Sequence, residues 1–269
     1  MAGASYVVTN LLNNASVVVA WNDTVPADIA DSTYPVTNLY NELPSKPGKS
    51  TSGSSTEQNI DIDFAANITQ DTIALINHNL VAGTSVLWQS DDNNDGNYSA
   101  VTTVATFTIR ARDMFQSFTQ VADKRYMRLN IGASGGDTTL VSIGEIVVGA
   151  KTQLTRPWVR RFEIPERWTN NVLRTPGGVV WSYNLTNQTR SFRVSWSGLS
   201  ASNLDELRTL AVATKGNHIP FTLIPYPDET GNPAAEVYYV RGSDLEIRGD
   251  YPVFDASMTF TELVRELQA

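Results

Sequence analysis

Short apolar or alternating segments, separated by polar turns, make up the first half of the chain. Residues 60–64 and 126–131 alternate between apolar and polar side chains, which predicts strands with one buried face. Residues 72–76 form an apolar run, as in a strand that is covered on both faces. Such segments recur at a spacing of roughly 8–12 residues, which is typical of a β-sandwich or barrel.

The second half continues with β-like segments and adds one helix. Alternation over residues 192–196 puts Phe192, Val194 and Trp196 on one face of a strand. A helix is expected near residues 203–214, with Ser202 as its N-cap and Gly216 at its C′ position. The expected apolar stripe of this helix is Leu204, Leu207, Leu210 and Ala211.

These patterns predict an all-β protein built of two β-sandwich domains. The first domain is expected over residues 1–150, and the second over residues 151–269 with the helix packed on it. We expect no membrane span, because no stretch approaches 18 apolar residues, and the amino terminus lacks the basic region of a signal peptide.

Composition narrows the chemistry. The 269 residues include no cysteine, which excludes disulfides, thiol catalysis and cysteine-ligated zinc. Only two histidines are present, His78 and His218, and a histidine at a strand end such as His78 is expected to be satisfied by the backbone. The net charge of −8 argues against nucleic acid as the main partner.

Charge is unevenly distributed along the chain. Residues 1–109 carry 2 bases and 11 acids, residues 110–193 carry 13 bases and 6 acids, and residues 194–269 carry 5 bases and 11 acids. Complementary segments of this kind suit a protein that binds copies of itself. The alternative is that the charges lie on separate solvated surfaces, where ion pairs contribute little.

The loop after residue 90 resembles the first half of a calcium-binding loop. Asp91, Asn93 and Asp95 are spaced as oxygen ligands, and Gly96 stands at the turn. The twelfth position is Thr102 instead of the bidentate glutamate, so a hairpin with an Asp-Gly turn is the favoured interpretation and no metal or other cofactor is expected.

The sequence predicts no enzyme. No serine lies in a Gly-x-Ser-x-Gly elbow, and no glycine-rich phosphate loop opens a helix. Glu163 and Glu166 could form a carboxylate pair for glycoside hydrolysis, but they flank Pro165 in an arginine-rich segment, where ion pairing is the ordinary explanation.

Arginines and tryptophans concentrate between residues 156 and 174. Arginine and tryptophan are enriched at protein interfaces, so this segment is a candidate interface; a solvated strand with core tryptophans, or stacking on single-stranded nucleic acid, are the alternatives. The candidate interface residues are Arg156, Trp158, Arg160, Arg161, Arg167, Trp168 and Arg174.

Three segments in order carry a resemblance to a known family. Residues 34–39 (YPVTNL), 60–64 (IDIDF) and 73–80 (IALINHNL) resemble tail-tip proteins of long-tailed bacteriophages, close to distal tail proteins. The amino-terminal halves of these proteins resemble galactose-binding, discoidin-like jelly rolls. Residues 143–149 fit the last strand of such a jelly roll. The second half is similar to distal-tail β-sandwiches.

The resemblance implies a virion structural protein made in the host cytoplasm. It would form a ring of identical copies that continues the tail tube, contact other baseplate proteins and dock fibres or receptor-binding proteins. The alternative function is a carbohydrate-binding module for host-surface glycans. The expected ligand loop for that alternative is Trp88, Asp91, Asn93, Asp95 and Tyr98.

Overall fold

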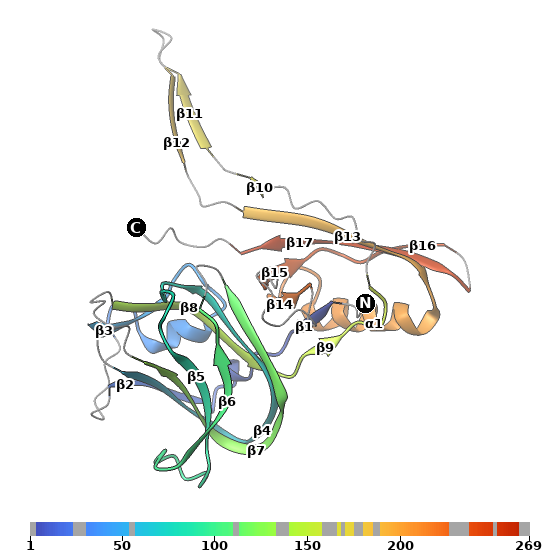
Figure 1. Ribbon diagram of the computed structural model, residues 1–269. Helices are drawn as coiled ribbons and strands as arrows, with labels where there is room; N and C mark the ends of the chain where they lie inside the picture. Colours follow the sequence, from blue (N-terminus) through green and yellow to red (C-terminus); the bar gives the residue numbers. More distant parts are fainter. Residues whose placement is uncertain are drawn as a thin grey trace.

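The computed structural model describes residues 4–23, 31–53, 57–109, 113–132, 140–157, 166–167, 170–174, 180–184, 189–225, 237–249 and 252–263. Over these residues the chain forms two large antiparallel sheets, a separate two-stranded hairpin and one α-helix, which confirms the all-β class. Figure 1 shows the two sheets side by side, with the helix beneath the second. The described part of the chain contains no helix with the length and apolar character needed to cross a membrane.

The first sheet folds over into a jelly-roll sandwich because two of its strands are very long. Its strands are β2 (Val18–Asp23), β3 (Gly48–Gly53), β4 (Gln58–His78), β5 (Val86–Asp91), β6 (Val101–Phe107), β7 (Met114–Ile131) and β8 (Leu140–Gly149). The register of the β4–β7 pair shifts between Asp63 and Thr72, and Ala65 and Asp123 take positive φ values. These irregularities bend both strands, so that β2, β5 and β6 join one layer and β3 and β8 join the other.

The alternation predicted for these strands is confirmed. Ile60, Ile62 and Phe64 point into the first core, while Asp61 and Asp63 point outward. The back part of β4 is buried on both faces, as the apolar run predicted. Ile73 and Leu75 belong to the sandwich core, and their neighbours belong to a separate cluster against the second sheet.

The second sheet gathers strands from both ends of the chain. Its strands are β1 (Ser5–Val7), β9 (Thr152–Gln153), β10 (Glu166–Arg167), β13 (Thr189–Leu199), β14 (Phe221–Ile224), β15 (Tyr238–Gly242), β16 (Glu246–Arg248) and β17 (Phe254–Glu262). β1 pairs with β14 on one side and with β9 on the other. The expected division at residue 150 therefore needs a correction at the amino terminus, because Ser5–Val7 joins the second sheet and the jelly roll is inserted between β1 and β9.

The helix α1 (Ala201–Thr214) packs on one face of this sheet. Leu204, Leu207 and Leu210 are buried as predicted. The N-cap is Ser200 instead of Ser202, because the Ser200 side chain accepts a hydrogen bond from the backbone N–H of Asn203. The cap lies two residues earlier because the preceding strand β13 ends at Leu199 and the chain turns at once.

The hairpin of β11 (Asn170–Arg174) and β12 (Val180–Asn184) projects away from the second sheet in Figure 1. Among the described strands, these two pair with each other alone. A two-stranded hairpin without a further layer is marginally stable in water, so this element depends on additional contacts for rigidity.

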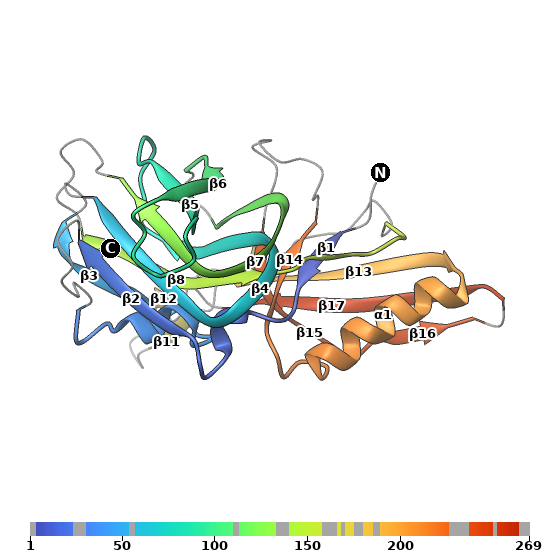
Figure 2. The same ribbon diagram turned by 90° about the horizontal axis from the view of Figure 1, so that it is seen from below.

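A third apolar cluster joins the jelly roll to the second sheet, and Figure 2 shows β14 and β1 beside β4 and β7. We call this contact the joint. It consists of Val7, Ala74, Ile76, Phe115, Val147, Ile224, Val237 and Tyr239, with the partly buried Leu263 packed against them.

Candidate functional site

The face of the second sheet opposite the helix is polar. Alternation along β13 turns Val194 and Trp196 toward the helix and leaves Arg193 and Ser195 on the other face. The strand β17 does the same with Asp255 and Ser257. This open face therefore follows directly from two alternating strands that are covered on one side only.

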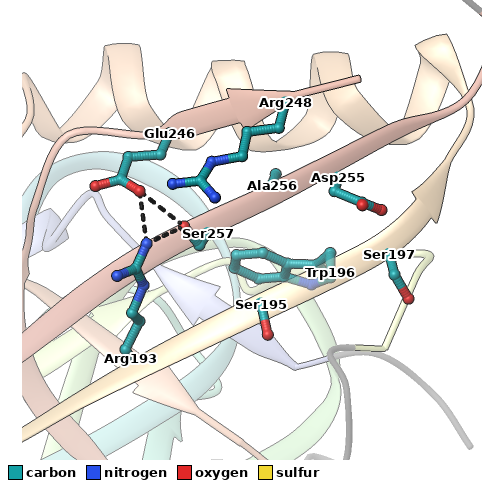
Figure 3. A pocket seen from close by; sticks show the side chains of 9 residues that line it. All are labelled: Arg193, Ser195, Trp196, Ser197, Glu246, Arg248, Asp255, Ala256 and Ser257. Atoms are coloured by element: carbon teal, nitrogen blue, oxygen red, sulfur yellow. Dashed lines mark hydrogen bonds and ion pairs between the residues drawn. The ribbon is translucent and has the colours of Figure 1, made fainter. Parts of the chain in front are cut away.

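A shallow cavity of about 340 Å³ lies on this face, where β16 pairs with the first residues of β17 (Figure 3). The polar residues that line it are Arg193, Ser195, Ser197, Glu246, Arg248, Asp255 and Ser257. Its volume is at the lower end of the range of small-ligand sites. We take this cavity, with its rim, as the candidate site.

Some charged side chains in the cavity have hydrogen-bond partners within the protein, and one does not. The Arg193 Nη2 atom donates to Glu246 Oε2 at 2.5 Å and to Ser257 Oγ at 2.8 Å. The Asp255 carboxylate accepts from the backbone N–H of Gly198 at 3.1 Å. Arg248 pairs with β17 through its backbone, but its guanidinium makes no hydrogen bond or ion pair with the described residues and faces the cavity. Figure 3 shows the Arg248 side chain extending over Ser257 toward the Arg193–Glu246 pair.

Such a site is suited to recognition. A planar guanidinium with five donors matches a carboxylate or a row of backbone oxygens on a partner. The cavity holds no cysteine or histidine, and the described residues contain no group of three or more His, Cys, Asp or Glu side chains placed to hold a metal ion.

The structure brings one predicted interface residue to this site. The Arg156 Nη2 atom donates to the backbone oxygen of Ser197, which lines the cavity, at 3.3 Å. Arg167 pairs with Thr189 and Arg174 with Val180 through their backbones, in β10 and β11. Trp158, Arg160, Arg161 and Trp168 lie outside the described residues, as does Glu163. Glu166 is the first residue of β10.

Two members of the predicted ligand loop are structural. Trp88 is 0% exposed within the first core, so its indole offers no face to a sugar, and the prediction that Trp88 is a ligand residue is wrong. The Tyr98 hydroxyl donates to the backbone oxygen of Met127 at 2.7 Å, and the Arg128 guanidinium lies 4.1 Å from the Tyr98 ring centroid. Burial raises the pKa of Tyr98 far above its ordinary value.

The Asp91 loop uses its ligand-like side chains internally. The buried Asp91 carboxylate accepts backbone N–H groups of Asn93, Asp95 and Gly96 at 3.2, 2.9 and 2.8 Å. The Lys124 ammonium donates to the backbone oxygens of Asp91 and Asp92. Asn93 donates to Ser99, and the backbone N–H of Asn97 lowers the pKa of Asp95. Backbone N–H groups therefore hold the Asp91 carboxylate, and the Lys124 ammonium supplies the positive charge in the loop.

The two histidines play different parts. His78 is buried at the end of β4, and its Nδ1 atom accepts a hydrogen bond from the backbone N–H of Leu80 at 3.2 Å, as predicted for a strand-end histidine. His218 is exposed after the helix.

Sequence reasoning missed Arg193, Glu246 and Arg248. The alternation of residues 192–196 could have flagged Arg193 as the outward position of a half-buried strand. Glu246 and Arg248 lie more than fifty residues further along, and only the pairing of β16 with Ser257, Ala256 and Asp255 brings them to the same face.

The outward face of the jelly roll carries a second polar array. Asp61 accepts from the Arg128 Nε atom at 2.5 Å and from the Asn22 Nδ2 atom at 2.8 Å. Next to it, Arg125 donates two hydrogen bonds to Asp63, at 2.6 and 2.8 Å. The Arg125 guanidinium is the main cause that lowers the pKa of Asp63.

Comparisons with known proteins give only distant structural likeness. No protein-family model matches the sequence, and no curated protein matches it. A chitosan-binding module of a chitosanase/glucanase from Paenibacillus sp. IK-5 is 18% identical and covers 52% of this chain and 98% of its own, with a TM-score of 0.41. The module CpGH89CBM32-6 from Clostridium perfringens is 14% identical, covers 52% of this chain and 98% of its own, and has a TM-score of 0.40. A Ruminococcus gnavus GH29 fucosidase in complex with fucose is 16% identical over 54% of this chain and 27% of its own, with a TM-score of 0.39.

Proposed function

We propose that the protein is a non-catalytic structural component of an assembly, in which the second sheet contacts neighbouring subunits and the jelly roll is displayed. In its specific form, this is a ring-forming component of a bacteriophage tail tip or baseplate that resides in the virion. The ring would continue the tail tube and dock fibre or receptor-binding proteins.

The observation that carries the proposal is the insertion of the jelly roll into the second sheet. The chain leaves this sheet after β1 and returns to it in β9, and the two strands pair at Ser5 with Gln153 and at Tyr6 with Thr152. The two neighbouring chain connections, after β1 and before β9, attach the jelly roll to the second sheet together with the apolar joint. A display role requires a mounted module of this kind, whereas a module on a single flexible linker would leave its orientation unspecified.

Two features of the second unit suit contacts with neighbours. The β11–β12 hairpin stands away from the sheet, where a neighbouring subunit would complete it. The open face presents Arg248, whose guanidinium has no partner in the described part of the chain, and, at the cavity rim, Arg156. Arginine in such positions is enriched among residues that dominate interface energetics.

The test is the mass of the purified full-length protein across concentration, by light scattering, with negative-stain images of the same samples. We expect closed oligomers, and we expect Arg248→Glu to raise the dissociation constant at least tenfold. The matched control is Arg208→Glu, which reverses an exposed arginine on the helix instead of on the open face. A monomer at every concentration, or equal effects of the two variants, would count against assembly through this face.

Carbohydrate binding is the second candidate, and the Asn22–Asp61–Arg128 array favours it. Planar amide, carboxylate and guanidinium groups on one sheet face offer paired donors and acceptors to sugar hydroxyls. A glycan array probed with wild type and Asn22→Ala tests it. Binding that Asn22→Ala weakens supports the candidate, and an array with no bound glycan excludes it for the sugars displayed.

A further inference from the structure

At the joint, a surface of the jelly roll and a surface of the second sheet meet, and each contains both apolar and polar side chains. On the second sheet, Val7 lies opposite Thr222 and Ser5 lies opposite Ile224, so these four side chains share the face toward the jelly roll. On the jelly roll, Thr72 lies opposite Ser117 and Ala74 opposite Phe115, on the face toward the sheet. Each surface therefore has an apolar patch with polar positions beside it.

Several of these polar positions have no hydrogen-bond partner among the described residues. The side-chain oxygens of Ser5, Ser117 and Thr222 are buried and unpaired, as are both polar atoms of Gln70, which shares the face of Thr72 on β4. Buried polar atoms without partners keep their full desolvation cost. Five of the eight unpaired buried side-chain atoms of the described residues belong to these four residues, so this cost is concentrated on the facing surfaces.

A buried carboxyl group lies on the same face of the jelly roll. Glu145 on β8 lies opposite Ile76 and is 0% exposed. Its oxygens accept from Asn10 Nδ2 at 3.3 Å and from the backbone N–H of Glu42 at 3.1 Å. No cation pairs with it among the described residues.

Burial and a neighbouring carboxylate oppose the ionisation of Glu145, whereas the hydrogen bonds from Asn10 and from the Glu42 backbone favour it. Glu42 belongs to the jelly roll, as Glu145 does. Tyr239 of β15 faces Glu145 from the second sheet, and Arg241 lies on the same strand as Tyr239. Burial raises the pKa of Glu145 well above its ordinary value, and the Glu42 carboxylate adds to this. Burial and the charge of Glu145 also raise the pKa of Tyr239.

We propose that the joint is a separable, proton-sensitive contact: it is closed while Glu145 carries a proton, and it opens and takes up water when Glu145 ionises. Opening hydrates the unpaired groups of Ser5, Gln70, Ser117 and Thr222, which offsets the loss of the apolar contact. The two chain connections, after β1 and before β9, tether the jelly roll, so that opening is a hinge motion. This inference goes beyond the proposed function and does not require it, although the same joint mounts the jelly roll in that proposal.

The sign of the pH effect follows from linkage. The closed state binds the Glu145 proton more tightly than the open state, so raising the pH favours opening. Between the ordinary carboxyl pKa and the raised one, the opening constant increases up to about tenfold per pH unit. Below the ordinary value the joint has its full stability.

Hydrogen–deuterium exchange of the full-length protein, corrected for the intrinsic pH dependence of exchange, tests the proposal. In wild type, we expect peptides of β1, β14 and β15 and of the back part of β4 and β8 to lose protection as pH rises. Peptides of β5 and β13, which lie outside the joint, should keep theirs. Equal protection of joint and core strands across the pH range would overturn the proposal without any variant.

Three variants sharpen the result. Glu145→Gln should remove most of the pH dependence at the joint, whereas Asp205→Asn, which changes an exposed carboxyl on the helix, should leave it unchanged. Thr222→Val replaces an unpaired hydroxyl by a methyl group and should slow opening severalfold at every pH. An unchanged pH profile in a folded Glu145→Gln protein would assign the proton-sensitive group elsewhere and refute the mechanism.

Discussion

The Tyr98 hydroxyl donates a 2.7 Å hydrogen bond to the backbone oxygen of Met127, across the face of the jelly roll. Tyr98 itself takes a positive φ of 49°, and the preceding residues form the turn around Asp91. The loop between β5 and β6 is therefore fastened to β7 by a side chain that sequence reasoning had assigned to ligand contact.

Removing this hydroxyl should destabilise the jelly roll. Tyr98→Phe leaves the Met127 oxygen without this donor and should lower the free energy of unfolding by about 1–2 kcal/mol. Urea denaturation followed by tryptophan fluorescence measures the change. Tyr34→Phe, in which the ring lies under Lys49 at the surface, is the control and should change stability little. Equal stability of Tyr98→Phe and wild type would show that the hydrogen bond contributes nothing.

Trp88 should behave as a core residue. Trp88→Ala removes a fully buried indole and should cost about 3–5 kcal/mol, while Trp88→Phe retains much of the volume and should cost less. The midpoint of denaturant unfolding reports both variants. A Trp88→Ala protein with wild-type stability and a specific loss of glycan binding would restore the ligand role that its burial contradicts.

The helix cap offers a matched pair of serines. Ser200→Ala removes the acceptor for the Asn203 N–H and should lower stability by about 1 kcal/mol. Ser202→Ala removes an exposed hydroxyl within the first turn and should change stability by less than about 0.5 kcal/mol. Thermal unfolding of the two variants side by side decides between the caps, and a larger effect at Ser202 would reverse the assignment.

The stability that the Asp63–Arg125 pair contributes should fall as the pH is lowered, whereas the stability of the joint at Glu145 should fall as the pH is raised. Because Arg125 lowers the pKa of Asp63 in the folded state, the pair stabilises the protein above the ordinary carboxyl pKa, and this contribution disappears as pH falls through the lowered value. Arg125→Met should therefore be slightly less stable than wild type at neutral pH. The difference should vanish in acid, and a difference that persists there would indicate a packing effect of the Arg125 stem.

The regular elements could be predicted because their signals are local. Alternation placed Ile60, Ile62 and Phe64 in the core, and the apolar run at residues 72–76 announced a strand buried on both faces. The leucine stripe located the helix, although its cap fell on Ser200, where the end of β13 determines the start of the helix. The backbone-satisfied His78 also followed from its position at a strand end.

The candidate site could be predicted only in part. Arg156 was singled out by composition, and the structure puts it at the rim of the cavity. Trp88 was misjudged because an aromatic residue beside a polar loop has the same local sequence whether it faces solvent or core. The direction it faces depends on the register of β5 with β7, which pairs Trp88 with Leu129.

Residue type and short-range spacing are enough to establish the all-β class, the alternating faces of the strands, the helix and the absence of cysteine chemistry. Long-range folding alone brings β1 into the second sheet, places Arg248 and Arg193 on the same cavity, and buries Glu145 beside Tyr239. These are contacts between residues more than fifty positions apart. Their energy comes from strand pairing and burial, which no local pattern along the chain encodes.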